Sequence, residues 1–170
     1  RKQGDFFMSK MTIRDFTDNA MIAAAYAVVT IVTSGFSYLG IQFRIAEILV
    51  LLCFFNPKYV IGVSLGCLIS NYFSPMQIPD MIFGTGATIV SSLLVVYSKR
   101  LWIASIFPVL INAPVVGLEL YYVLGLPFWL SAGQVAIGEA TVMIIGLLIF
   151  YPLSQNQYFH RLLRSRRINK

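Results

Sequence analysis

The stretch INAPVVGLELYYVLGLPFWLSAGQVAIGEA, residues 111–140, decides the fold of this chain. It reads as the outer parts of two apolar helices joined by a short turn at Gly125-Leu126-Pro127. An ionisable side chain at membrane depth is costly, so it normally faces the bundle interior and serves a ligand or an ion path. Four polar side chains interrupt the apolar sequence here: Asn112, Glu119, Gln134 and Glu139.

The spacing of these four side chains predicts two polar layers if the helices fold back on each other near Leu126. Glu119 lies seven residues before Leu126, and Gln134 lies eight residues after it. Asn112 lies fourteen residues before Leu126, and Glu139 lies thirteen residues after it. At 1.5 Å rise per residue the layers are roughly 10 Å apart. The two layers would line a pocket rich in hydrogen-bond acceptors, and its size suits a small polar molecule. The alternative is that the four groups only join helix to helix by hydrogen bonds, but two carboxylates favour a binding site.

The composition indicates an integral membrane protein. Of the 170 residues 58% are hydrophobic and only 12% are charged, whereas a soluble domain is about a quarter charged. Several apolar runs reach about 20 residues, the length that crosses a bilayer. Cys53 and Cys67 both lie in apolar segments, so we interpret them as buried thiols. The chain shows no His/Glu metal pair, no GxSxG and no phosphate-binding glycine loop, so we predict no enzyme, no cofactor and no metal.

Six apolar segments predict an all-α membrane domain over residues 16–152, between a cytoplasmic N-terminal segment (1–15) and a basic cytoplasmic tail (153–170). The second segment is short for a crossing, so we expect the loop before it to enter the membrane or to be covered by protein. The first run is too long for a cleavable signal, and Met8 and Met11 are candidate start residues. The expected spans are 16–35, 45–55, 59–73, 81–98, 101–124 and 130–151.

The basic residues predict the orientation of this domain. With six spans, every lysine and arginine except Arg44 falls on one side. The positive-inside rule then places both termini in the cytoplasm. The basic tail resembles a nucleic-acid-binding run in composition, but beside a final span it is expected to contact anionic lipid.

The acidic residues of the outer half predict the chemistry of the ligand. Glu47, Asp80, Glu119 and Glu139 all fall there, with Arg44 as the only cation. An excess of carboxylates favours a cationic ligand or one rich in hydrogen-bond donors. Two alternatives stay open, namely an ion pair between Arg44 and Glu47 at i,i+3 spacing and an Asp80 that only caps its helix. Trp129 either stacks on the ligand or belongs to an interfacial aromatic belt.

Small residues in the first and third spans predict close helix packing. The third span carries Gly62-xxx-Gly66, and the first carries two interleaved small-xxx-small pairs. This spacing lets a second backbone approach closely, whether inside the chain or on another subunit. The alanines concerned are Ala20, Ala23, Ala24 and Ala27.

Six motifs stand out along the chain, together with Gly138-Glu139: IQFRIAEIL (41–49), FNP (55–57), SLGCLISNYFSP (64–75), DMIFGTGAT (80–88), NAPVVGLEL (112–120) and LPFW (126–129). These motifs resemble the QueT family, the substrate-binding S components of energy-coupling factor (ECF) transporters implicated in uptake of queuosine precursors. The resemblance covers about residues 15–152. A proline often stands near the position of Cys53 in the family, and its absence here bears on packing in the second span.

The resemblance implies an ECF S-component fold with six helices, cytoplasmic termini and a shared ECF module, made of a coupling transmembrane protein and two ATPases. It makes the four alanines candidates for the surface that docks on the coupling protein. The implied substrate is a cationic deazapurine, a 7-deazaguanine such as 7-aminomethyl-7-deazaguanine. Carboxylates suit its adjacent N–H donors.

We therefore expect Glu139 with Asn112 to hold one end of the ligand and Glu119 with Gln134 the other. The loop over residues 35–44 is the expected lid. Three alternatives remain open: an S component for another vitamin or base, a stand-alone proton-coupled carrier, and a structural subunit without a ligand. For the carrier, no inverted repeat is visible in the sequence. The other candidate ligand-binding residues are Gln42, Arg44, Glu47, Asn71, Asp80 and Trp129.

Overall fold

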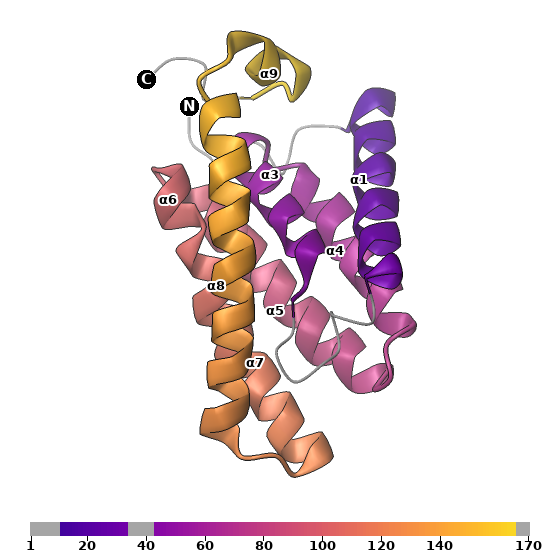
Figure 1. Ribbon diagram of the computed structural model, residues 1–170. Coiled ribbons are helices and arrows are strands. Elements are labelled where there is room, and N and C mark those ends of the chain that lie inside the picture. The colour runs from indigo at the N-terminus through magenta and orange to yellow at the C-terminus, as the bar shows by residue number, and fades with distance from the viewer. Residues whose placement is uncertain (1–10, 34–42, 166–170) are drawn as a thin grey trace.

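The computed structural model of the chain describes residues 11–33 and 43–165, and every regular element in these ranges is a helix (Figure 1). In chain order the elements are α1 (Ile13–Val32), the 3-10 helix η2 (Ile45–Leu51), α3 (Leu52–Phe55), α4 (Tyr59–Tyr72), α5 (Ile78–Tyr97), α6 (Leu101–Ala104), α7 (Ile106–Leu124), α8 (Phe128–Leu153) and α9 (Gln157–Leu162).

The prediction of an all-helical chain is confirmed, and four of the six expected spans are long and apolar enough to cross a membrane. These are α1, α5, the run of α6 and α7 over Leu101–Leu124, and α8. The run of η2 and α3 over Ile45–Phe55 and helix α4 are apolar but shorter. That the second span is short was expected, but its 3-10 start was not. That the chain crosses the membrane six times, and that both termini are cytoplasmic, stay predictions.

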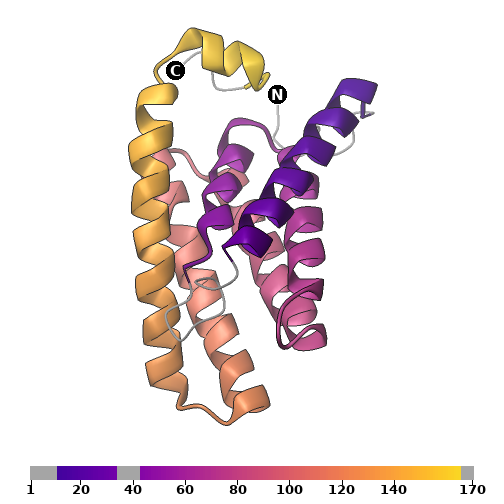
Figure 2. The ribbon, with the colours of Figure 1, turned by 45° about the vertical axis from the view of Figure 1, so that its right-hand side comes forward.

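The helices form one bundle in which α8 and α1 lie on opposite sides (Figures 1 and 2). Between them run η2 and α3, with α4, α5 and α7 behind. Helix α9 crosses the end of the bundle at which α1 begins, and we call this the α9 end. The turn between α7 and α8 projects at the other end, which we call the hairpin end.

The α9 end is held by a buried carboxylate. Thr12 and Asp15 form a capping box at the start of α1, in which each side chain accepts from the other's backbone N–H. One oxygen of Asp15 lies 2.6 Å from Lys58 Nζ and the other 3.1 Å from an Arg164 nitrogen. Three segments far apart in sequence are thereby joined, and among the described residues every lysine and arginine but Arg44 belongs to a segment at this end.

The contact between α1 and α4 confirms the expected close-packing face at Gly62 and Gly66. A Cβ on Gly62 would lie 2.7 Å from the carbonyl oxygen of Asn19, and one on Gly66 2.6 Å from Cβ of Tyr26. Ala23 and Ala27 are buried on the same face of α1, next to this contact. Ala20 and Ala24 are exposed, so the two alanine pairs point in different directions.

The predicted hairpin of α7 and α8 is present, and its turn is the expected Gly125-Leu126-Pro127. Gly125 ends α7 with φ 69°, a left-handed conformation that glycine adopts without a Cβ clash. Further along the pair, a Cβ on Gly117 would lie 2.8 Å from Cβ of Ala132. Because these small residues let the helices approach, the polar groups of both helices come close to the bundle axis.

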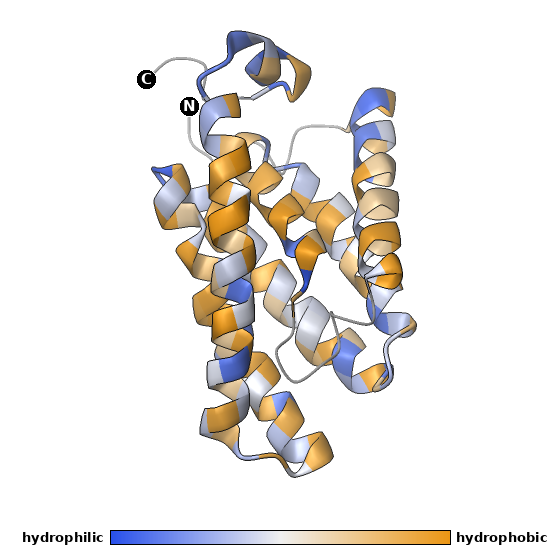
Figure 3. Cartoon of the chain, viewed as in Figure 1, coloured by the Kyte–Doolittle hydropathy of each residue, from blue (hydrophilic) through white to orange (hydrophobic). Residues whose placement is uncertain are grey.

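The outer surface of the bundle is largely hydrophobic, and hydrophilic bands lie at mid-depth on α8 and at the start of η2 (Figure 3). Leu148 on α8 is 72% exposed, and large apolar side chains are exposed along the other long helices as well. An apolar outside with polar groups inside is the pattern of a helix bundle in lipid. The buried thiols Cys53 and Cys67 are free, as expected.

Candidate functional site

The interior polar groups are arranged around Arg44, which directly precedes η2. Its buried guanidinium donates a hydrogen bond to Oδ1 of Asn71 on α4. The Asn71 amide in turn donates to the carbonyl oxygen of Asp80 at 2.9 Å and to the Thr85 hydroxyl at 3.2 Å. Gly84 makes room for this arrangement, because a Cβ there would lie 2.9 Å from Nδ2 of Asn71. The start of η2, α4 and α5 are thus joined at one point.

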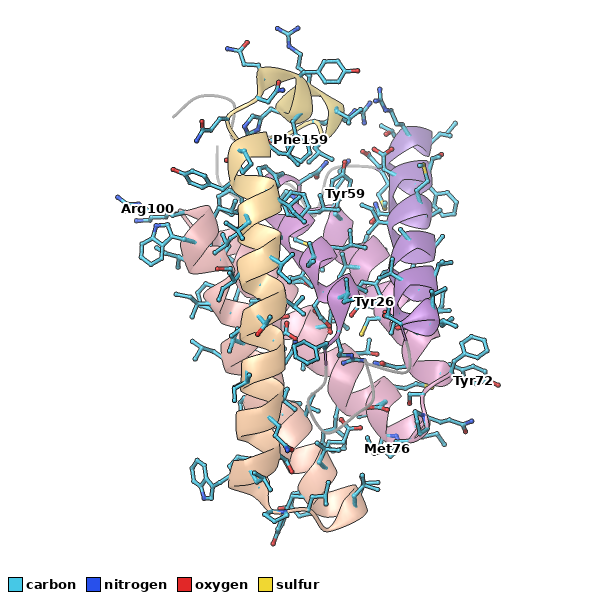
Figure 4. All side chains as sticks on the ribbon, viewed as in Figure 1. Tyr26, Tyr59, Tyr72, Met76, Arg100 and Phe159 are labelled. Atoms are coloured by element: carbon cyan, nitrogen blue, oxygen red, sulfur yellow. The ribbon has the colours of Figure 1, made fainter. Side chains whose placement is uncertain are left out.

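Glu47 lies three residues further along, fully buried on η2. Its Oε1 accepts hydrogen bonds from the Tyr26 hydroxyl on α1 at 2.6 Å and from the Thr88 hydroxyl on α5 at 3.1 Å. Figure 4 shows Tyr26 in the interior of the bundle beside η2. The alternative of a local ion pair between Arg44 and Glu47 is wrong, since the two side chains are not among the ion pairs of the described residues. Arg44 has ψ 78° and therefore does not stand above Glu47 in a regular helix.

Glu119 on α7 and Glu139 on α8 are also buried in this interior. The charged neighbours of Glu119 are Asp80 and Arg44. Those of Glu139 are Glu47 and Arg44, and the Asn112 amide faces it as well. Arg44 therefore acts on all four interior carboxyls. We call the following set the carboxyl cluster: Arg44, Glu47, Asn71, Asp80, Asn112, Glu119 and Glu139.

The carboxyl cluster holds buried polar atoms that no described residue satisfies. The acceptors among them are both oxygens of Glu119 and one oxygen from each of four other side chains. The donors belong to Arg44 and Asn112. Buried polar atoms in native proteins are nearly always hydrogen-bonded, and leaving one unmade costs about 1–3 kcal/mol. The single oxygens are Glu47 Oε2, Asp80 Oδ2, Asn112 Oδ1 and Glu139 Oε1, and the donors are Arg44 Nε and Asn112 Nδ2.

The structure brings most, but not all, of the predicted site residues together. The expected neighbours Glu139 and Asn112 are found side by side. Gln134 is only half-buried, and in the described part of the chain it makes no hydrogen bond to Glu119, whose neighbour is Asp80. Trp129 is 84% exposed at the start of α8 and does not line the interior, which favours the interfacial belt. Gln42 and residues 35–42 of the expected lid lie outside the described residues.

The alternative in which Asp80 serves only as a helix cap is also wrong. The N-cap of α5 is Gln77, and Asp80 is the third residue of the helix, after Pro79. Its carboxyl is buried next to Glu119. Pro79 fits the first turn of α5 because no backbone donor is needed there. Asp80 follows it in the same turn, and its carboxylate lies inside the bundle.

The carboxyl cluster is chemically an oxygen-rich cage with one guanidinium. Within the residues that the structure describes, no group of three or more histidine, cysteine, aspartate or glutamate side chains is arranged to hold a metal ion. The unsatisfied oxygens and nitrogens of these side chains can hold a ligand by hydrogen bonding and charge. The arrangement suits a donor-rich molecule that also presents an acceptor to Arg44.

Comparison with known proteins agrees with this picture. The model of the QueT transporter family matches residues 16–155. The chain belongs to the QueT transporter family. A curated relative, the queuosine precursor transporter QueT of Lactococcus lactis subsp. cremoris (strain MG1363), is 32% identical over 164 residues, which cover 87% of this chain and 96% of the relative. No solved structure matches the chain.

Sequence reasoning missed three side chains that support the cluster of this QueT family member. Tyr26 and Thr88 donate to Glu47, and Thr85 accepts from Asn71. Tyr26 reads as a core residue because it stands in an apolar span. Thr85 and Thr88 are three residues apart on α5 and so share a helix face; this spacing, directly after Asp80, is the signal that would have found them.

Proposed function

We propose that this QueT family member is the membrane substrate-binding subunit, the S component, of an ECF-type ABC importer. It captures a queuosine precursor, a 7-deazaguanine such as 7-aminomethyl-7-deazaguanine, from outside a bacterial plasma membrane. ATP hydrolysis by partner subunits then drives uptake. The observation that carries the proposal is the excess of buried, unsatisfied acceptor oxygens in the carboxyl cluster.

The charge of the cluster supports a cationic ligand. Glu47, Asp80, Glu119 and Glu139 face a single guanidinium in the interior. Removing like charges from water without compensation is costly. An ammonium group supplies both positive charge and hydrogen-bond donors, and hydrogen bonds between charged groups contribute about 1.5–3 kcal/mol each.

The hydrogen-bonding pattern supports a guanine-like ring. The aminomethyl deazaguanine offers donors at its ammonium, N1–H, 2-amino and pyrrole N–H groups, and acceptors at O6 and N3. The cluster offers the reverse, with many acceptors and free donors at Arg44 Nε and Asn112 Nδ2. Adjacent N1–H and 2-amino donors suit one carboxylate bidentately. The pairs Glu119 with Asp80 and Glu139 with Asn112 are the two candidate ends of the ligand site.

The helix surfaces support a partner on the opposite side of the bundle from α8. Ala20 and Ala24 leave a smooth strip on the exposed face of α1, whereas Ala23 and Ala27 are used inside the chain. Small exposed residues allow close approach of another helix. We assign the Ala20/Ala24 strip to the coupling transmembrane protein. The basic α9 end is then the cytoplasmic end.

Calorimetry on the purified protein tests the substrate. We expect 7-aminomethyl-7-deazaguanine to bind more tightly than the 7-cyano compound, which lacks the ammonium group, by about tenfold or more, as the loss of one charge-assisted hydrogen bond predicts. Glu119→Gln and Glu139→Gln should each weaken binding, whereas the control Asp18→Asn, the same chemical change on the α1 segment at the α9 end, should not. Absence of deazaguanine binding, or wild-type affinity in both glutamine variants, would refute the proposed substrate.

Transport assays separate the S component from a stand-alone carrier. Liposomes that contain this chain with the coupling protein and ATPases should accumulate the deazaguanine only when ATP is supplied. Liposomes with the chain alone should show no uptake under a pH gradient. Uptake by the chain alone would assign it to the proton-coupled carriers, and selective binding of a different vitamin or base would reassign the cargo.

A further inference from the structure

A groove on the outside of the bundle, far from the carboxyl cluster, has the features of a lipid site. It lies between α6 and α8 and has a volume of about 260 Å³. Its lining is almost entirely apolar and includes two amphipathic aromatic residues. The lining residues are Trp102, Leu147, Leu148, Tyr151 and Pro152.

The position of the groove suits a membrane lipid. Trp102 and Tyr151 are about half exposed, and both belong to the residue types that gather at the level of lipid headgroups. Leu147 and Leu148 continue the groove along α8 toward the middle of the bundle. An acyl chain lying along these leucines therefore places its headgroup at the α9 end.

The charge beside the groove specifies the headgroup. Lys99 and Arg100 directly precede α6, and Figure 4 shows Arg100 at the outer edge of the bundle. From Lys99 to the end of the chain the only acidic residues are Glu119 and Glu139, and both are buried in the carboxyl cluster. No carboxylate of this half of the chain therefore neutralises Arg100. An anionic headgroup at the membrane surface has the charge to do so.

We propose that the α6–α8 groove binds an anionic phospholipid, with an acyl chain on Leu147 and Leu148 and the phosphate at Arg100. Tyr151 lines the groove as well, and its hydroxyl is a further candidate donor to the headgroup. Helix α1, which carries the exposed Ala20/Ala24 strip, lies on the other side of the bundle from α8 (Figures 1 and 2). The lipid and the proposed coupling protein thus occupy separate surfaces, and this inference stands apart from the proposed substrate.

Native mass spectrometry of the chain from nanodiscs containing equal phosphatidylglycerol and phosphatidylcholine tests the proposal. One basic residue near the surface contributes about 1 kcal/mol to the binding of anionic lipid, which is about fivefold in affinity. The wild type should therefore retain phosphatidylglycerol at least about fivefold more than phosphatidylcholine. Arg100→Gln should lose about fivefold of this preference, and Arg14→Gln, an exposed basic residue of α1 at the same end, should not change it.

A second pair of variants tests the apolar part of the groove. Leu148→Trp should fill the groove and reduce the retention of both lipids, whereas Leu110→Trp, at an exposed position of α7 outside the groove, should not. Both leucines are exposed, so neither change disturbs the core. Equal retention of the two lipids by the wild type, equal effects of Arg100→Gln and Arg14→Gln, or a partner protein cross-linked through Trp102 in place of lipid would each overturn the proposal.

Discussion

Gly84 offers a test of the carboxyl cluster that changes no charge. A Cβ at this position would lie 2.9 Å from Nδ2 of Asn71 and 3.3 Å from one guanidinium nitrogen of Arg44. The Asn71 amide is held by its own hydrogen bonds to α5, so it has little freedom to move away. In Gly84→Ala the amide must retreat by about 0.5 Å to regain ordinary van der Waals separation, and the guanidinium that it holds must follow.

The expected magnitudes separate stability from binding. Replacing a helical glycine by alanine contributes about 0.5–1 kcal/mol of stability through the backbone, and overpacking costs about 1–3 kcal/mol. The free energy of unfolding should therefore fall by roughly 0–2.5 kcal/mol. Displacing Arg44 weakens a charge-assisted hydrogen bond of about 1.5–3 kcal/mol. We therefore expect the affinity for 7-aminomethyl-7-deazaguanine to fall about tenfold or more.

The matched control is Gly86→Ala, two residues along the same helix. A Cβ there meets no atom within 4 Å, so this variant should be as stable as the wild type or more stable and should bind the ligand normally. Calorimetry gives the affinity, and thermal unfolding in detergent gives the stability. Wild-type affinity in Gly84→Ala, or an equal loss in both variants, would refute the role assigned to the Arg44–Asn71 pair.

Three further substitutions probe the scaffold by thermal unfolding in detergent. Tyr26→Phe removes the hydroxyl that donates to Glu47 at 2.6 Å, so the free energy of unfolding should fall by about 1.5–3 kcal/mol. Gly66→Ala places a Cβ 2.6 Å from the Tyr26 side chain and should separate α1 from α4 at a cost of about 1–3 kcal/mol. Asp15→Asn breaks the contact with Lys58 at 2.6 Å; we expect a loss of about 1 kcal/mol that shrinks in high salt.

Each of these changes has a control of the same chemical type. Tyr158→Phe alters an exposed tyrosine on α9, Gly133→Ala meets no atom within 4 Å, and Asp18→Asn removes a carboxylate that forms no ion pair with a described residue. Tyr158→Phe and Asp18→Asn should leave the unfolding temperature nearly unchanged, and Gly133→Ala should leave it unchanged or raise it slightly. A control that destabilises as much as its partner would show that the loss does not arise from the named contact.

The sequence predicts the helices well because the bilayer imposes their length and composition. The first and last expected spans, 16–35 and 130–151, lie within a few residues of α1 and α8. The turn at Gly125 is predictable because only glycine adopts its left-handed conformation without strain. The glycine pair on α4 likewise predicts a close contact, although the spacing does not say that Asn19 and Tyr26 are the residues met there.

The contacts of the carboxyl cluster are harder to predict because they depend on how neighbouring helices are rotated. Helical spacing places Asn112 and Glu119 on one face of α7, but it does not reveal that Asp80 of α5 faces Glu119 in place of Gln134. The backbone of Arg44, just before the 3-10 helix, is not helical, and its guanidinium donates to Asn71, a partner that the i,i+3 spacing to Glu47 does not predict. The sequence allows Trp129 either to stack on the ligand or to belong to the interfacial aromatic belt, and only its exposure in the structure separates these alternatives.

A structure of the complex with 7-aminomethyl-7-deazaguanine tests the central claim most directly. We predict the ligand between η2, α5, α7 and α8, with its ammonium and its N1–H and 2-amino donors within hydrogen-bond distance of the Glu119 and Glu139 carboxylates and an acceptor facing Arg44. A ligand bound elsewhere, with these carboxylates satisfied by protein side chains alone, would contradict the account.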